Sequence, residues 1–171
     1  MKFKNFNSFL RNLTSKASTK TIILIKNKKK TVKAMIHLTS KNYLNENGDY
    51  YKIFFKEDGY LLIIPGTKEV YFSDILQGKI PGITDEMIGK KKIIILNGKK
   101  YRLENKDDYQ FVLRLYVGSP LDIEGECRFS DYLPIEGPHE FLSLGWLSYD
   151  KKRADLHCKV IDLKDIGVVR R

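Results

Sequence analysis

The sequence predicts a mainly β protein: a single antiparallel β sandwich or distorted barrel, with an N-terminal amphipathic helix and one or two short helices. An α+β arrangement is the alternative. The clearest signal is the pair Asn97 and Gly98, which separates an apolar run at 93–96 from an alternating run at 99–103. Asn and Gly tolerate the positive φ angles of a type I′ turn, whose twist matches that of paired strands.

Length and composition indicate one domain. The chain has 171 residues, of which 42% are hydrophobic, with only five prolines and twelve glycines. A chain of this length buries roughly 70% of the surface that it exposes when unfolded, so its core needs no disulfide or metal. We expect two sections within the domain, a basic helix and first hairpin at 1–45 and a β-rich body at 46–171, separated by turn-forming residues.

The first twenty residues carry their apolar side chains at helical spacing, within a stripe about 120° wide. The stripe consists of Phe3, Phe6, Phe9, Leu10 and Leu13. Lys, Arg, Asn and Ser fill the opposite face, so an amphipathic basic helix is expected. Such a helix most often packs on the core of its own protein. The alternatives are a helix on a membrane surface, an organelle transit peptide and a helix that docks on a partner.

Runs that are β-branched or alternate between apolar and polar residues predict the strands. The expected strands are 21–26, 31–38, 50–55, 60–64, 69–72, 93–96, 99–103, 109–117, 121–129, 140–149 and 154–163. The segment 109–117 also fits a helix. Residues 27–30 should form the basic tip of the first hairpin, and 131–138 a loop. Capping residues predict short helical turns at 74–77 and 85–88.

The formal net charge of +10 is confined to one part of the chain. The first 45 residues contain eleven Lys or Arg and no Asp or Glu. The remaining residues contain twenty Lys or Arg and twenty-one Asp or Glu, so their charges nearly cancel. A segment of one sign predicts an anionic partner, although a solvated basic face without a partner is the alternative. The candidate contacts are Lys2, Lys4, Arg11, Lys16, Lys20, Lys26, Lys28, Lys29, Lys30 and Lys33.

One row of carboxylates could hold a metal. Asp122, Glu124 and Glu126 alternate along an expected strand and would share one face, and Asp131 could fold back toward them. Carboxylate oxygens suit Mg²⁺ or Ca²⁺, but a strand holds its side chains in a row, whereas metal ligands must converge. A solvated acidic face is therefore the simpler interpretation, and a small metal-dependent enzyme is the third functional hypothesis.

Zinc is not expected at Cys127, His139, His157 and Cys158. Neighbouring strand residues point to opposite faces, so His157 and Cys158 should not share an ion, and Cys158 should be a small buried hydrophobe. The motifs of a nucleophile elbow and of phosphate-binding glycine loops are missing. No cofactor is expected, and Trp146 is interpreted as a core anchor.

These patterns favour a non-enzymatic binding or adaptor module whose basic N-terminal segment engages an anionic partner. A membrane surface or an acidic protein is preferred, because an electrostatic arm for nucleic acid does not need three phenylalanines on one face. Nucleic-acid or ribonucleoprotein binding through the same lysines is the alternative. The two cysteines lie far apart, and no apolar run approaches the roughly 20 residues of a transmembrane helix, so a cytoplasmic protein is predicted. If the partner is a membrane surface, the protein would be peripheral to that membrane.

Overall fold

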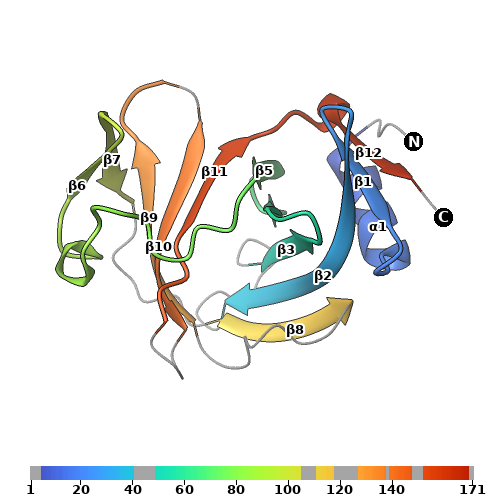
Figure 1. The fold of residues 1–171 in the computed structure, drawn as a ribbon, viewed down its shortest axis with the longest axis horizontal. Coiled ribbons are helices and arrows are strands. Elements are labelled where there is room, and N and C mark those ends of the chain that lie inside the picture. The colour runs from blue at the N-terminus through green and yellow to red at the C-terminus, as the bar shows by residue number, and fades with distance from the viewer. Residues whose placement is uncertain are drawn as a thin grey trace.

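The computed structural model describes residues 5–40, 49–104, 111–117, 127–137, 139–147 and 152–169, and this part of the chain is mainly β (Figure 1). The elements are the helix α1 (Phe6–Lys16), the strands β1 (Ile22–Ile25), β2 (Lys28–Ser40), β3 (Asp49–Phe55), β4 (Tyr60–Ile64), β5 (Glu69–Ser73), β6 (Ile93–Leu96), β7 (Lys99–Leu103), β8 (Phe111–Val117), β9 (Cys127–Pro134), β10 (Glu140–Leu147), β11 (Leu156–Val160) and β12 (Ile166–Val169), and the 3-10 turns η2 (Asp85–Met87) and η3 (Leu163–Asp165).

All twelve strands pair antiparallel in one sheet, in the order β12-β1-β2-β3-β4-β5-β11-β10-β9-β7-β6, with β8 beside β2. The long strand β2 shares one of its edges between two partners, since residues 28–31 pair with β1 and residues 35–40 with β8. Its pairing with β3 shifts register between Val32 and Ala34. The predicted β class is confirmed, and among the described residues the ends of the sheet are not joined.

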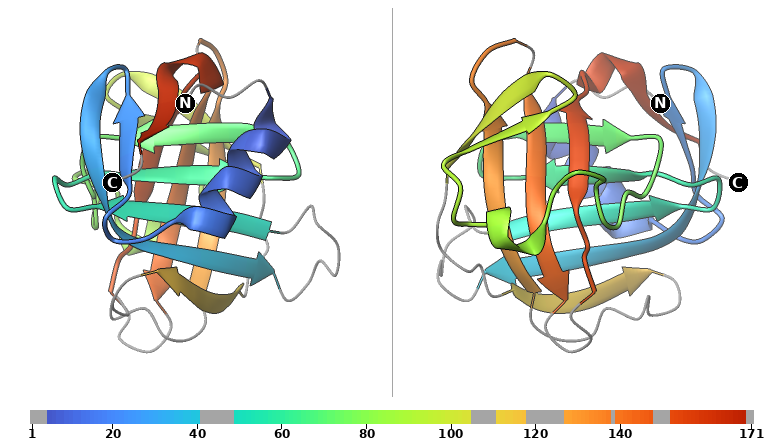
Figure 2. Two further views of the ribbon diagram at one scale, coloured as in Figure 1. Left: turned by 90° about the vertical axis from the view of Figure 1, so that its right-hand side faces the viewer. Right: turned by 60° about the vertical axis from the view of Figure 1, so that its left-hand side comes forward.

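The strands form layers (Figure 2). Strands β3, β4 and β5 run across β9, β10 and β11 at a steep angle, and α1 lies on the face of β3–β5 that points away from β9–β11. One apolar cluster joins α1, β1 and η3–β12 to this outer face, a second fills the space between the two groups of strands, and a third packs residues 80–88 and the β6–β7 hairpin on β9 and β10.

The helix α1 uses its apolar stripe for the first of these clusters. Asn5 caps it by accepting a hydrogen bond from the Ser8 amide at 2.9 Å. Phe6, Phe9 and Leu13 are 7%, 0% and 1% exposed. Leu10 is half-buried against the same cluster, and Phe3 lies outside the described residues. The core-packing interpretation of this helix is therefore confirmed for these four residues.

The turns at 26–27 and 97–98 differ in how well their positions were predicted from the sequence. Asn97 and Gly98 have φ angles of 51° and 76°, as predicted. In the first hairpin the positive φ angles fall at Lys26 and Asn27, so Lys28 to Lys30 belong to β2. The prediction of a basic tip at 27–30 was wrong in register, because Lys28 pairs with Ile25 and extends the ladder.

Three local predictions were wrong for tertiary reasons. Residues 131–134 are strand rather than loop, because β9 pairs with both β10 and β7. Residues 74–77 are not helical, since the Leu76 amide donates to the Asp58 carboxylate at 3.1 Å instead of to a helical carbonyl. The strand expected at 154–163 is a strand only over β11, and the chain continues past it through η3 into β12, which was not predicted and pairs with β1. The 3-10 turn η2 confirms the helical turn predicted at 85–88.

No helix of the described chain is long and apolar enough to cross a membrane.

Candidate functional site

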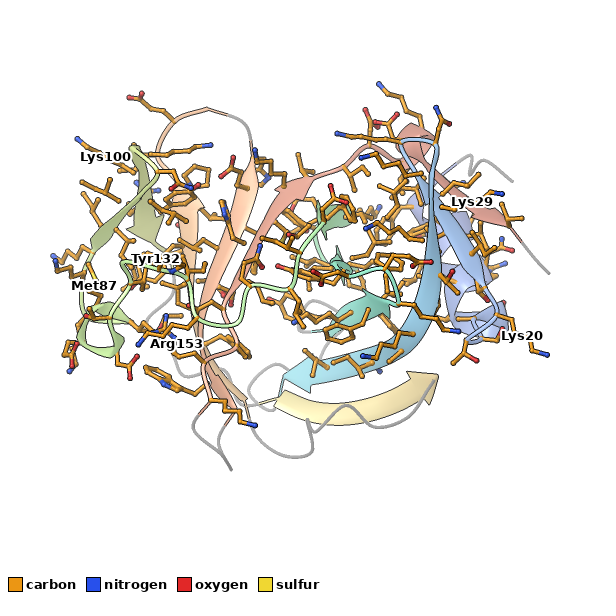
Figure 3. The ribbon with its side chains drawn as sticks, in the orientation of Figure 1. Lys20, Lys29, Met87, Lys100, Tyr132 and Arg153 are labelled. Carbon is orange, nitrogen blue, oxygen red and sulfur yellow. The ribbon has the colours of Figure 1, made fainter. Side chains whose placement is uncertain are left out.

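The basic residues predicted to bind an anionic partner are mostly exposed but spread out. Lys2 and Lys4 lie outside the described residues, as does the side chain of Lys16. In Figure 3, Lys20 and Lys29 project from the α1 side of the molecule at different heights. The exposed members of the set are Arg11, Lys20, Lys26, Lys28, Lys29 and Lys33.

Lys30 has a different role from its neighbours. Its residue is only 8% exposed, and its ammonium lies 3.2 Å from a carboxylate oxygen of Asp74 and donates to the Asp58 carbonyl at 3.2 Å. The same ammonium lies 5.8 Å from the ring centre of Phe72. Lys30 therefore cross-links β2 to the turn at 56–59 and to the segment after β5, and is not available to a partner.

A cavity of about 390 Å³ lies beside this turn, between the β2–β3 strands and the start of β11. Its size is within the range of small-ligand pockets, about 300–1,000 Å³. Four cationic and two anionic side chains line it together with an apolar wall. The lining residues are Lys33, Lys52, Phe54, Phe55, Lys56, Asp58, Gly59, Leu76, Gly78, Arg153, Ala154, Asp155 and Leu156. We call it the basic cavity.

Lys52 is the most buried of the three lysines in the basic cavity, at 7% exposed, whereas Lys33 and Lys56 are exposed. Strand alternation places Lys52 on the same face of β3 as Phe54, toward the space between the two groups of strands. Its ammonium lies 5.0 Å from the ring centres of both Phe54 and Tyr60. Aromatic faces attract a cation, so these rings help to keep a positive charge on a face that is otherwise apolar.

Arg153 and Asp155 neutralise each other within the basic cavity. The Arg153 guanidinium donates to both Asp155 carboxylate oxygens, at 2.9 and 2.5 Å, and to Asp85 at 2.7 Å. Asp155 is fully buried and also accepts from the Ile80 amide at 2.9 Å. Burial alone would lower the pKa of Arg153, but these carboxylates raise it. The pair joins residues 80–85 to the start of β11, so the excess charge of the basic cavity comes from its lysines.

The second carboxylate of the basic cavity, Asp58, is held by backbone amides. It accepts hydrogen bonds from the Gly59 amide at 2.7 Å and from the Leu76 amide at 3.1 Å. Gly59 has a φ of 86°, and a Cβ there would lie 2.4 Å from the Ser73 carbonyl oxygen. Glycine is therefore required for the turn to approach β5 this closely. The amides hold the Asp58 carboxylate in place without cancelling its charge, and the lysines of the lining outnumber it.

Two clusters of Tyr, Glu and His lie elsewhere. Glu140 accepts from the Tyr101 hydroxyl and lies 3.1 Å from both His157 Nε2 and Lys99 Nζ. Burial alone would raise the pKa of Glu140, but these partners lower it to about 2. Glu69 forms the second cluster with the Tyr71 hydroxyl at 3.0 Å and His139 Nδ1 at 2.9 Å. Each histidine thus has a carboxylate and a phenol beside it.

The described residues give little support for the predicted metal site. Asp122, Glu124 and Glu126 lie outside them, and Asp131 accepts a hydrogen bond from the Ser143 hydroxyl at 2.5 Å. Burial raises the pKa of Asp131 to about 6, although this hydrogen bond opposes the change. Within the described ranges no three His, Cys, Asp or Glu side chains group as metal ligands. Cys158 is a buried free thiol, as predicted, and burial raises its pKa to about 12.

Comparison with known proteins gives no relative. No family model, no curated protein and no solved structure matches this chain. The chemistry of the basic cavity is therefore the best guide to function. Sequence analysis named Lys33 but missed Lys52, Lys56, Phe54 and Arg153. One signal was present, since Lys52 interrupts the aromatic run of β3 at a position that alternation assigns to the buried face.

Proposed function

We propose that the protein is a non-enzymatic binding module for an anionic partner, and that the basic cavity receives an anionic group carried on an apolar body. The observation that carries the proposal is the lining of the cavity. Lys33 and Lys56 are exposed cationic side chains of the lining, and Arg153 pairs with Asp155, so the lining carries more positive than negative charge.

The apolar wall of the basic cavity indicates that the anionic group of the ligand is attached to an apolar group. Phe54 and Leu156 supply this wall and are at most 7% exposed, whereas Leu76, which also lines the basic cavity, is 53% exposed. A phosphate, sulfonate or carboxylate that meets the lysines would place an attached ring or short alkyl chain against this wall. Apolar contact adds to the Coulomb attraction and reduces its dependence on salt.

The burial of the α1 stripe removes the reason for preferring a membrane as the partner. Phe6, Phe9 and Leu13 were the side chains expected to enter the headgroup region, and all three belong to the core. We favour an acidic protein or a small amphipathic anion instead. The exposed lysines on β2 and the exposed Arg11 on α1 would then attract the partner from a distance.

The test uses the fluorescent amphipathic anion anilinonaphthalene sulfonate, titrated against the full chain and then displaced by phenyl phosphate. The double variant Lys33→Gln with Lys56→Gln should weaken binding by about tenfold or more, if each lysine contributes about 0.7 kcal/mol or more. Lys68→Gln changes an exposed lysine outside the cavity and should leave binding within about twofold.

Two outcomes would contradict the proposal. One is an equal loss of binding in the Lys68→Gln control, which would show that binding depends on the overall charge of the protein and not on the basic cavity. The other is unchanged binding in the double variant. If single-stranded oligonucleotides or anionic liposomes bind strongly in a salt-dependent manner that ignores the cavity variants, the exposed lysines rather than the basic cavity recognise the partner.

A further inference from the structure

The strand β6 forms the end of the described sheet and is open on one side. It pairs with β7, and in the described ranges no strand lies on its other edge. In Figure 1 this hairpin lies at the opposite end of the molecule from α1. Ile93 and Ile95 are 48% and 63% exposed, which is unusual for two isoleucines on one strand face.

The backbone of the same two residues points away from β7. The Leu103 amide donates to the Lys92 carbonyl at 2.8 Å, and Ile94 is opposite Tyr101. Hydrogen-bonded and non-hydrogen-bonded pairs alternate in an antiparallel ladder, so Ile94 and Leu96 bond to β7. The N–H and C=O groups of Ile93 and Ile95 are therefore directed toward the open edge.

An open groove of about 760 Å³ lies over this hairpin. It is lined by Ile93 and Ile135, which are both about half exposed, and by the turn at Asn97 and Gly98. The Ile135 amide donates to the Lys100 carbonyl at 3.0 Å, which holds Ile135 beside β7. An apolar side chain on a strand added to β6 would find Ile93 and Ile95 as cross-strand neighbours.

The charges around this edge have one predominant sign. Lys90, Lys91 and Lys92 precede β6 and are exposed. Across the ladder, Lys100 is opposite Ile95 and Arg102 is opposite Ile93. Figure 3 shows Lys100 projecting outward at this end of the molecule. The nearby exposed carboxylates include Glu136, Glu104 at 3.9 Å from Arg102, and Glu86, whose charge interacts with that of Lys90.

We propose that β6 is a docking edge for an extended acidic segment of a partner protein, which adds to the sheet as an antiparallel or parallel strand. Backbone hydrogen bonds to Ile93 and Ile95 supply affinity, and their side chains select apolar residues at alternate positions. Acidic residues of the segment meet Lys90, Lys91, Lys92 and Lys100. A second copy of this chain fits less well, because pairing two β6 strands brings like charges together.

The edge proposal does not depend on the proposed function. The β6 groove and the basic cavity share no lining residue. Variants of one site therefore leave the other unchanged, and the two proposals fail separately.

The test measures binding of a capped, dye-labelled peptide that alternates glutamate with valine, by fluorescence anisotropy with the full chain. Ile95→Pro removes an outward amide without removing a hydrogen bond to β7, so the hairpin should remain paired. We expect at least about tenfold weaker binding for this variant. Ile95→Lys is a second variant that keeps the backbone amide and removes the apolar contact. Ile75→Lys, at an isoleucine 57% exposed elsewhere, is the matched control and should bind normally.

Two further peptides separate pairing from charge. A peptide with lysine in place of glutamate should bind at least about tenfold more weakly, and so should one with proline in place of valine. Equal binding of the proline peptide would overturn the proposal, since only charge would then matter. Unchanged binding by Ile95→Pro and Ile95→Lys would overturn it as well. Self-association that Ile95→Pro abolishes would make the partner a second copy of this chain.

Discussion

The two Tyr-Glu-His clusters contain the same residue types in different surroundings. The Glu140 side chain is 7% exposed and has Lys99, His157 and Tyr101 as partners. The Glu69 side chain is 27% exposed, and its partner His139 is 48% exposed. Burial strengthens electrostatic interactions and makes an unpaired charge costly, whereas exposed pairs contribute little. Burial, rather than residue identity, should therefore decide which carboxylate matters for stability.

The largest difference between the clusters should appear when Glu140 is changed to Gln. The variant removes the charge of a carboxylate whose side chain is 7% exposed, and hydrogen bonds to a charged group contribute about 1.5–3 kcal/mol. We expect a loss of this order in the free energy of unfolding at pH 7, measured by urea denaturation. A loss below about 1 kcal/mol would show that the site is better solvated than its exposure indicates.

Acid should affect the Glu140 cluster next most strongly. The pKa of Glu140 is about 2 in the folded protein against 4.5 without perturbation, so its ionised form stabilises the fold. This stability is fully present above about pH 4.5 and is lost as the pH falls toward 2. The change should be at most about 3 kcal/mol, at about 1.4 kcal/mol per pKa unit.

The measurement is the difference in unfolding free energy between the natural chain and Glu140→Gln across this range of pH. The difference should shrink steadily in acid. A difference that stays constant between pH 5 and 3 would contradict the assigned pKa.

Asp131 differs from Glu140 because its described partner is a hydroxyl rather than a cation. Its pKa of about 6 is above the usual 3.8, so the folded state prefers the protonated acid. The resulting stability is fully present below about pH 4 and is lost as the pH rises through 6. Asp131→Asn should therefore gain stability relative to the natural chain between pH 4 and 8, by at most about 3 kcal/mol.

Thermal unfolding of the natural chain and of Asp131→Asn at pH 4 and at pH 8 would measure this change in relative stability. Ser143→Ala provides the control, since it removes the Asp131 hydrogen-bond donor and should raise the pKa of this carboxyl further. An Asn variant whose relative stability does not change with pH would disprove the assignment.

The smallest effect is expected at the exposed cluster. Glu69→Gln keeps a hydrogen-bond acceptor for Tyr71 and loses only a solvent-screened interaction with His139. The expected cost is below about 1 kcal/mol at pH 7. Urea unfolding under the conditions used for Glu140→Gln measures it. A cost equal to that of Glu140→Gln would remove the distinction between the clusters.

Local structure could be predicted from the sequence better than tertiary contacts could. The spacing of Phe6, Phe9 and Leu13 predicted both the helix and its buried stripe, because each depends only on helical periodicity. The Asn97 and Gly98 turn was also predicted, since its φ angles are a local property. Its place at the end of the sheet was not, because the order of strands depends on pairing between distant segments.

The candidate sites depend on such distant pairings. Lys52 and Arg153 line one cavity only because β5 pairs with β11 and so joins the two groups of strands. Likewise, the pairing of β10 with β11 puts Glu140 opposite Lys159 and diagonal to His157, and β7 adds Tyr101 by pairing with β9. The histidines were considered only as zinc ligands, because adjacent positions in the sequence do not reveal partners on other strands.

The pairing of β1 with β12 has a consequence for biosynthesis. These strands come from opposite ends of the described chain, and together with α1 they cover one face of β2–β5. During translation Ile22, Ile23 and Ile25 emerge early, but their neighbour on the open side of β1 emerges only after β11. An apolar strand that waits for its partner is prone to misassembly, and contacts between distant segments slow folding. The open side of β1 therefore remains exposed to misassembly until residues 166–169 leave the ribosome.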